Sequence, residues 1–316
     1  MVYIWGMNGT PLVPSVVRAL AVGFALLGAS GAQAQTPSFT LVGHSFPPGQ
    51  GGSVLFGVSA DGRATAGYSL PALGLPAYKA FSWHAGSGRT DFGLEPGLPG
   101  ATAGQAISGD GSTVVGYSRG PDSTSDNTRT AFRWSGTGTF QSLGTLPGYT
   151  DSWALGVDND GSTVVGYASG PGGVAPRAYR WTASGGMQPI AGNSSQANAI
   201  SRNGSVIVGE FAVESGAPQG FRWTQAGGLQ PLASLSGSAS SYARGVNADG
   251  SVIVGLSVVG TADVPTRWIN GVPTQLPVPS GWGNNANPLA VSDNGQVIVG
   301  TGAPSSGGGT GAAIWT

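Results

Sequence analysis

Residues 106–118 read AISGDGSTVVGYS, and residues 131–134 read AFRW. The same pattern recurs as LGVDNDGSTVVGYA at 155–168 with AYRW at 178–181, and as AISRNGSVIVGE at 199–210. Each copy combines a short apolar segment, an Asp-Gly or Asn-Gly turn, a Val/Ile-rich run that ends in Gly, a variable segment and an aromatic-x-Trp run. This repetition decides the fold.

Two markers of the pattern recur six times, in step, along the chain. The turn glycines are Gly62, Gly111, Gly161, Gly204, Gly250 and Gly295, separated by 49, 50, 43, 46 and 45 residues. The matching tryptophans are Trp83, Trp134, Trp181, Trp223, Trp268 and Trp315. Such a fixed period indicates repeated units that bury one another's apolar faces, and therefore one domain.

Each unit predicts four short strands, a to d. Strand a is the apolar segment, and the turn Gly after it supplies a positive φ at little cost. Strand b is β-branched, and its closing Gly, such as Gly116, predicts close backbone approach between sheets. Strand c carries both aromatic rings on one face. We therefore expect an all-β fold, a six-bladed β-propeller with four-stranded blades, over residues 35–316.

The two ends of the chain complement each other. Residues 312–316 read AAIWT, which is strand c of the sixth unit, and no strand d follows. Residues 38–43 read SFTLVG, which resembles the strand d segments and belongs to no unit. We expect this N-terminal strand to complete the last blade and close the ring, which removes an open sheet edge. A truncated C-terminus is the alternative.

The N-terminus resembles a secretory signal. Arg18 precedes the apolar run ALAVGFALLGAS at 19–30, and Ala32 and Ala34 occupy the small positions before a cleavage site. The run is shorter than the roughly 20 residues that span a bilayer. We expect a signal peptide at 1–34, cleavage after Ala34 and a secreted chain, extracellular or periplasmic, without a membrane span. An uncleaved anchor is the alternative.

Composition excludes several classes of function. The net charge is −1, and the single Lys among 27 charged residues leaves no basic block for nucleic acid. The absence of Cys excludes disulfides and thiolate metal sites. His44 and His84 lack a partner at ligand spacing. Residues 158–161, DNDG, begin like a calcium loop but lack its distal Glu, so a hairpin is favoured over calcium. We predict no metal, cofactor or catalytic residue.

The repeated side chains are interpreted as structural. The six tryptophans are expected to wedge between blades because aromatic rings bury large areas. The arginines that precede four of them, Arg133, Arg180, Arg222 and Arg267, point away from the aromatic face. Pairing of these arginines with turn carboxylates such as Asp110, Asp160 and Asp249 is a hypothesis.

The units, which read A-x-x-V/I-S-x-D-G-S-x-V-V-G-Y-S followed by A-F-x-W, resemble the HAF repeats of bacterial extracellular proteins. The resemblance covers residues 38–316. The His of the His-Ala-Phe motif is replaced here by Lys79, Thr130 and Arg177. The resemblance implies a propeller-like secreted or surface protein and implies no enzymatic activity.

Variable segments define a candidate binding rim. The b–c and d–a connections lie on one rim of a propeller, and they hold residues 70–79, 95–104, 119–129, 145–152, 236–242 and 277–285. Loops on a rigid scaffold often carry binding residues. The candidate ligand-binding residues are Tyr149, Trp153, Tyr242 and Trp282, because exposed aromatics stack on sugar rings or peptides. These rings could instead fold back as local plugs.

The leading interpretation is a secreted or envelope-associated binding or interaction module without catalytic activity, which takes a glycan or protein partner through this rim. A glycan-directed hydrolase or lyase is the alternative, with two carboxyl groups about 5–10 Å apart in the central funnel. The carboxylates outside the repeat turns are Asp91, Glu95, Asp122, Asp126, Asp151, Glu210, Glu214 and Asp263. A structural surface repeat without a defined ligand is the third interpretation.

Overall fold

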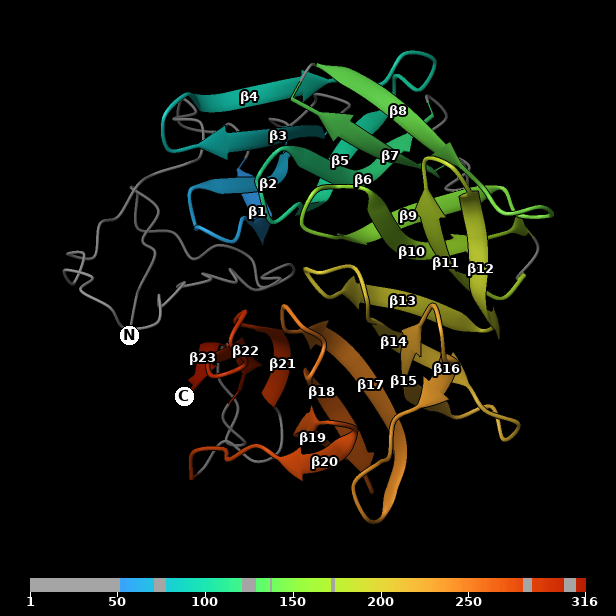
Figure 1. Ribbon diagram of the computed structural model, residues 1–316, viewed down its shortest axis with the longest axis vertical. Helices are drawn as coiled ribbons and strands as arrows, with labels where there is room; N and C mark the ends of the chain where they lie inside the picture. Colours follow the sequence, from blue (N-terminus) through green and yellow to red (C-terminus); the bar gives the residue numbers. More distant parts are fainter. Residues whose placement is uncertain are drawn as a thin grey trace.

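The computed structural model describes residues 52–70, 78–120, 129–136, 138–171, 174–280, 286–303 and 311–316. These residues form six antiparallel sheets that follow one another around a ring, as Figure 1 shows. The predicted six-bladed β-propeller is therefore confirmed. Within the described ranges, no helix is both long and apolar enough to cross a membrane.

Five blades contain four strands, ordered from the axis outward. They are β1 (Ser53–Val58), β2 (Ala64–Ser69), β3 (Lys79–His84) and β4 (Gly88–Gly93); β5 (Ala101–Ile107), β6 (Thr113–Arg119), β7 (Arg129–Ser135) and β8 (Thr139–Gly144); β9 (Asp151–Val157), β10 (Thr163–Ser169), β11 (Arg177–Thr182) and β12 (Gly186–Asn193); β13 (Ser195–Ile200), β14 (Ile207–Ala212), β15 (Pro218–Thr224) and β16 (Gly228–Pro231); β17 (Ser238–Val246), β18 (Val252–Val259), β19 (Ala262–Ile269) and β20 (Val272–Gln275).

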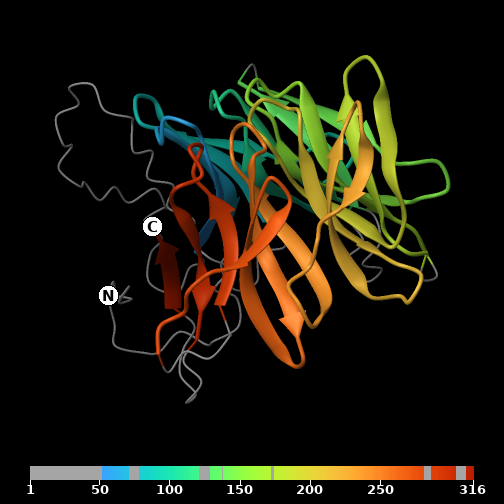
Figure 2. The ribbon, with the colours of Figure 1, turned by 60° about the horizontal axis from the view of Figure 1, so that its bottom comes forward.

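The described part of the sixth blade has three strands. These are β21 (Ala286–Val291), β22 (Ile298–Gly302) and β23 (Gly311–Trp315). Figure 2 shows β23 at the outer side of this sheet, beside the C-terminus. The segment 38–43, which was expected to be its fourth strand, lies outside the described residues.

The inner strands lie so close together that most side chains are excluded between them. Each inner strand contacts the next one, from β1 to β5 and onward to β21. A Cβ on Gly57 would meet the backbone of Ala106 and Ile107 in the next blade. The six residues at this position are Gly57, Ala106, Gly156, Ala199, Gly245 and Ala290. Small residues are therefore required where the blades converge on the axis.

A β-bulge precedes each of these small residues. The extra residues are Phe56, Gln105, Leu155, Asn198, Arg244 and Leu289. A bulge bends the strand and re-aims a side chain. The six inner strands therefore carry six side chains at equivalent places around the axis.

Two backbone N–H groups bond to side-chain oxygens of the a–b turn in every blade, and in four blades a Ser hydroxyl also donates to the turn Asp or Asn. In the second blade, the Ser108 hydroxyl accepts from the Thr113 N–H (2.9 Å) and donates to Asp110 (2.6 Å), and Asp110 accepts from the Ser112 N–H (2.8 Å). The turn glycines all have positive φ, from 69° to 82°, as predicted. At Asp61, hydrogen bonds from the Ser59 hydroxyl and the Arg63 N–H lower the pKa of the carboxyl group.

The closing glycine of strand b was expected to allow close approach between sheets, but the closest approach is within one sheet. A Cβ on Gly209 would overlap the carbonyl oxygen of Gln196 on the inner strand of the same blade. The same overlap occurs at Gly67, Gly116, Gly166, Gly255 and Gly300. The physical cause is the bulge, which bends the inner strand toward its neighbour.

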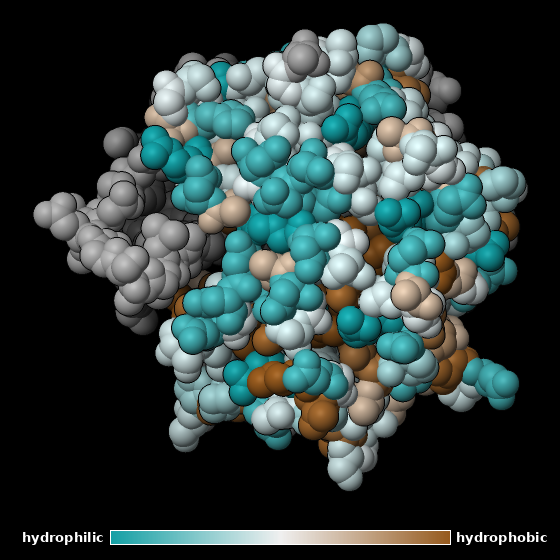
Figure 3. Space-filling view, viewed as in Figure 1, coloured by the Kyte–Doolittle hydropathy of each residue, from teal (hydrophilic) through white to brown (hydrophobic). Residues whose placement is uncertain are grey.

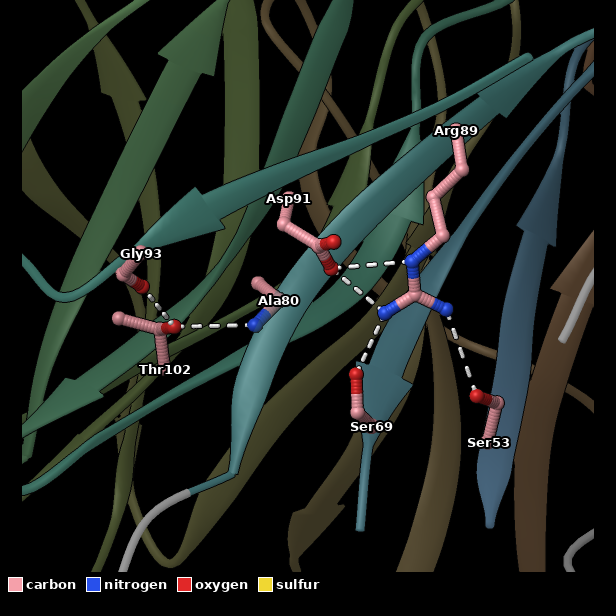
Figure 4. Close-up of polar contacts among 7 residues, drawn as sticks. All are labelled: Ser53, Ser69, Ala80, Arg89, Asp91, Gly93 and Thr102. Atoms are coloured by element: carbon pink, nitrogen blue, oxygen red, sulfur yellow. Dashed lines mark hydrogen bonds and ion pairs between the residues drawn. The ribbon is translucent and has the colours of Figure 1, made fainter. Parts of the chain in front are cut away.

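A hydroxyl joins successive blades at four junctions, and we call this arrangement the interblade latch. In Figure 4, Thr102 of β5 accepts from the Ala80 N–H of β3 (2.9 Å) and donates to the Gly93 carbonyl of β4 (2.7 Å). The other latch hydroxyls belong to Ser152, Ser195 and Ser241, which accept from Ala131, Ala178 and Gly220. Each latch satisfies a buried N–H that would otherwise lose its hydrogen bond.

Five repeat tryptophans pack against residues of the preceding blade, as predicted, and Trp134, Trp181 and Trp268 among them are buried. Trp134 also stacks on Phe92 of the preceding blade, with ring centroids 3.8 Å apart. The ion-pair hypothesis for the repeat arginines is wrong. Arg133 donates from Nε to the carbonyl oxygen of Gly161 (2.9 Å), and no ion pair joins the four arginines to a turn carboxylate in the described part of the chain.

We predict that Gly209→Ala lowers the free energy of unfolding by about 3 kcal/mol, because the new Cβ overlaps a backbone atom that only a shift of the strand can move. Gly192→Ala is the control, since a Cβ there meets nothing within 4 Å. Urea titration of both variants measures the difference. Equal midpoints for the two variants would contradict the close approach.

Candidate functional site

The predicted residue Trp153 is the centre of a cluster that bridges the second and third blades. Its ring stacks on Tyr167 of β10, with centroids 4.7 Å apart and an interplanar angle of 15°. The Arg129 guanidinium of β7 lies 5.3 Å from the Trp153 ring centroid and 5.9 Å from that of Tyr117. All four side chains are partly exposed. We call Tyr117, Arg129, Trp153 and Tyr167 the aromatic cluster.

The backbone around the aromatic cluster is fixed by hydrogen bonds. The Arg129 N–H donates to Asp151 (2.8 Å), whose second carboxyl oxygen accepts from the Thr150 hydroxyl (2.6 Å). The buried Tyr179 hydroxyl donates to the carbonyl oxygen of Trp153 (2.9 Å). The cluster therefore presents a guanidinium and stacked rings on strands that are held in place, which suits stacking and cation–π contacts with a ligand.

Tyr149 folds back onto the protein. It therefore follows the alternative stated for the rim aromatics, that they fold back as local plugs. Its ring packs against the buried core that contains Leu146, and its N–H donates to the Leu146 carbonyl (3.0 Å). Its hydroxyl donates to Asn193 (3.1 Å) on the last strand of the same blade. Tyr149 therefore supports the connection to β9 and is separate from the aromatic cluster.

Tyr242 lies in a second, more polar group between the fourth and fifth blades. The Arg244 guanidinium stands 5.3 Å from the Tyr242 ring centroid. Asn198 donates to Glu210 and to the Ala243 carbonyl (2.8 Å). We call Asn198, Glu210, Tyr242 and Arg244 the polar cluster. Burial raises the pKa of Glu210, and Arg244 and the Asn198 hydrogen bond oppose this shift.

The remaining rim predictions are only partly described. Trp282 and most of 70–79 and 119–129 lie outside the described residues. Three segments expected as connections run into inner strands, because β5 begins at Ala101, β9 at Asp151 and β17 at Ser238. The inner strands begin early because they must start at the rim where the preceding blade ends.

The described residues offer no cluster of side chains for a metal ion. They contain no group of three or more His, Asp or Glu side chains placed to hold a metal ion. Asp158, at the start of the calcium-like sequence, accepts from the Thr163 N–H (3.0 Å) and the Ser162 hydroxyl (2.9 Å), as the hairpin interpretation requires. Glu95 is buried in the connection between β4 and β5, where burial raises its pKa and Ser118 opposes the shift.

The rim formed by the a–b turns carries a polar contact near the axis. The Arg202 guanidinium, in the turn of the fourth blade, donates from Nε to Asp293 in the turn of the sixth (2.8 Å). Backbone hydrogen bonds join successive turns, including Ala60 to Gly109 (2.8 Å). Figure 3 shows this rim, with hydrophilic residues around its middle.

The aromatic cluster lies toward the other rim, because Arg129 begins β7 and Trp153 lies near the start of β9. Asn198 and Arg244 of the polar cluster lie nearer the a–b ends of β13 and β17.

Comparison with known proteins supports the fold. No protein-family model and no curated protein matches the sequence. The β-propeller domain of the Trilobed protease from Pyrococcus furiosus aligns with a TM-score of 0.58 and 10% identity, over 83% of this chain and 78% of that chain. TolB from Acinetobacter baumannii aligns with a TM-score of 0.51 and 17% identity, over 81% of this chain and 67% of that chain.

Prolyl oligopeptidase B from Galerina marginata is also similar, with a TM-score of 0.56 and 10% identity over 80% of this chain. This chain spans only 38% of that protein. At such identities the similarity shows a β-propeller fold and carries no activity over to this chain.

Sequence reasoning missed most members of the two clusters. Tyr117 and Tyr167 follow the closing Gly of strand b, and Glu210 stands at the same position in the fourth blade. Asn198 and Arg244 occupy bulges, where the other blades hold Phe, Gln or Leu. For Glu210 and Arg244 the available signal was a break in the repeat, because each is the one charged residue at its position among the six blades.

We predict that Glu210→Gln flattens the dependence of stability on pH. Because the pKa of Glu210 is raised in the folded state, the wild-type protein loses stability as pH rises from about 4.3, the unfolded value, through the folded pKa. The Gln side chain does not titrate, so this loss disappears. Urea midpoints from pH 4 to 8 measure the effect, with the exposed Glu214→Gln as control. Identical profiles for wild type and Glu210→Gln would contradict burial of an ionisable group.

Proposed function

We propose that this chain is a secreted or envelope-associated β-propeller that binds a glycan or protein ligand on the rim of the b–c and d–a connections and performs no catalysis. The aromatic cluster is the main observation that supports this proposal. Trp153 departs from the Val, Ala, Gln, Tyr and Asn found at its position in the other blades, so the repeat fold does not require a Trp there. Binding energy is often concentrated in a few Trp, Tyr and Arg side chains.

Two further considerations support the proposal. The cluster is partly exposed although aromatic rings in the blade cores are buried, as Phe81, Phe132 and Phe221 are. The expected signal peptide at 1–34 and the resemblance to HAF repeats both favour a place outside the cytoplasm. These two expectations are part of the proposal.

The enzymatic alternative depends on Glu210. This carboxyl group is half-buried, and partial burial raises its pKa, as in a general acid. Its closest polar partners are Asn198 and Arg244, and neither is a second carboxyl group. A glycosidase needs a pair of carboxyl groups. The polar cluster therefore favours binding over hydrolysis.

We predict that Trp153→Ala weakens ligand binding at least about tenfold, because loss of an aromatic anchor costs about 2 kcal/mol. Glycan and peptide arrays probed with the secreted wild-type protein identify the ligand, and titration measures the variant. Arg133→Ala is the control: it removes an arginine from the same strand as Arg129, where it bonds to Gly161 rather than to the aromatic cluster.

Three results would reject parts of this proposal. Binding unchanged in Trp153→Ala would move the site elsewhere. Conversion of an array ligand to product, lost in Glu210→Gln, would establish the enzymatic alternative. No ligand on either array would favour a structural repeat protein.

A further inference from the structure

Glu210 and Arg244 of the polar cluster carry opposite charges on neighbouring blades but do not pair. Arg244 opposes the rise in the pKa of Glu210 that burial causes, so the two groups lie near each other. The ion pairs among the described residues nevertheless belong to Arg89 and Arg202. The buried Nε of Arg244 has no hydrogen-bond partner in the described part of the chain. A buried donor without a partner costs free energy, so a ligand that supplies an acceptor here gains binding energy.

Local contacts keep the two charges apart. The Asn198 amide donates to Glu210 and to the carbonyl oxygen of Ala243 (2.8 Å), which ties Glu210 to the junction of the fourth and fifth blades. The Arg244 guanidinium instead lies 5.3 Å from the ring centroid of Tyr242, on its own strand. This cation–π contact orients the guanidinium but leaves its Nε without an acceptor.

A buried acceptor without a partner lies on the next inner strand. Asn287 of β21 pairs with Thr301 at the register position where Tyr242 of β17 pairs with Leu256. The Oδ1 atom of Asn287 is buried and has no hydrogen-bond partner among the described residues. β17 and β21 are in contact. The inner strands of the fifth and sixth blades therefore present both a donor and an acceptor that the described protein leaves unsatisfied.

The polar cluster is accessible to solvent. Its four side chains are all partly exposed, although three of them belong to inner strands. Asn198 and Arg244 occupy bulges, and the bulge residues of the other four blades are partly exposed as well. Because the inner strand is the one nearest the axis, a small ligand can reach these side chains from the axis.

We propose that the polar cluster binds a neutral sugar, whose hydroxyl groups donate to Glu210 and accept from the Arg244 guanidinium. This site does not rest on the proposed function, because the aromatic cluster contributes no residue to it.

The two charges favour a neutral ligand. A carboxylate would be attracted by Arg244 but repelled by Glu210, and an ammonium group would meet the opposite combination. A hydroxyl group both donates and accepts hydrogen bonds, so it can satisfy a carboxylate and a guanidinium together. A sugar carries several hydroxyl groups on one ring, and it can therefore serve the separate donors and acceptors of the cluster at once.

Leucine occupies equivalent places in neighbouring blades, so both charges can be replaced by a residue that this fold already accepts. The Arg244 bulge corresponds to Leu289 of the sixth blade, and the Glu210 position corresponds to Leu256 of the fifth. We therefore expect Arg244→Leu and Glu210→Leu to fold, which cooperative unfolding in urea would show.

The test measures binding of D-glucose, D-galactose and D-mannose, each alone, to the purified protein by saturation-transfer NMR. At least one of these sugars is expected to bind the wild-type protein. Its dissociation constant is expected to rise at least about tenfold in Arg244→Leu and in Glu210→Leu, because each variant loses hydrogen bonds to a charged group. Gln105→Leu is the matched control: it removes the polar bulge residue of the second blade and is expected to bind as wild type does.

A comparison of charged sugars needs no variant. The uronic acid and the amino sugar of the same series carry a carboxylate and an ammonium group, and both are expected to bind the wild-type protein more weakly than the neutral sugar. Stronger binding of the uronic acid would overturn the proposal in favour of an anion site.

Two other results would also overturn the proposal. One is that none of the three neutral sugars binds the wild-type protein. The other is that both leucine variants bind as wild type does. In the second case, loss of binding in Trp153→Ala would assign the sugar to the aromatic cluster and so support the proposed function alone. Retained binding in Trp153→Ala, together with loss in the leucine variants, is the result expected for a separate site.

Discussion

Close approach of backbone around the axis is the constraint on which this fold depends. Six inner strands converge where a residue such as Gly57 has no room for a Cβ, and a bulge in each strand presses it against the closing glycine of its neighbour. In most strands a glycine lowers stability, because it loses much conformational entropy on folding and has no side chain to pack. Alanine adds only a methyl group to the packing. Here they recur because sheets cannot meet at a common axis with larger side chains between them.

Hydrogen bonds from hydroxyl groups make many of the contacts that ion pairs make in other proteins. Only 27 residues are charged, and the turns and latches are built from Ser, Thr and Asn side chains that satisfy backbone N–H groups. Such bonds keep buried polar groups paired without the desolvation cost of an ion pair. The half-buried carboxyl group of Glu210 is an exception, and its raised pKa is the consequence.

The same architecture separates scaffold from candidate site. The a–b rim is closed by short turns, by their backbone hydrogen bonds and by the Arg202–Asp293 pair. Departures from the repeat lie elsewhere, with Trp153 and Arg129 toward the other rim and Glu210 and Asn198 within their strands. In both clusters the described residues depart from the repeat pattern.

The sequence alone determined the number of blades, the strand order and the core role of the tryptophans, because turn glycines and period-two apolar residues are local signals. It also indicated Trp153, which breaks the pattern. Tertiary structure decided what the local pattern cannot encode. The partner of each closing glycine, the carbonyl bond of Arg133 and the folding back of Tyr149 all depend on which segment lies alongside in space. The meeting of Arg129 with Trp153 across two blades was likewise invisible, because their contact follows from the curvature of the ring rather than from spacing along the chain.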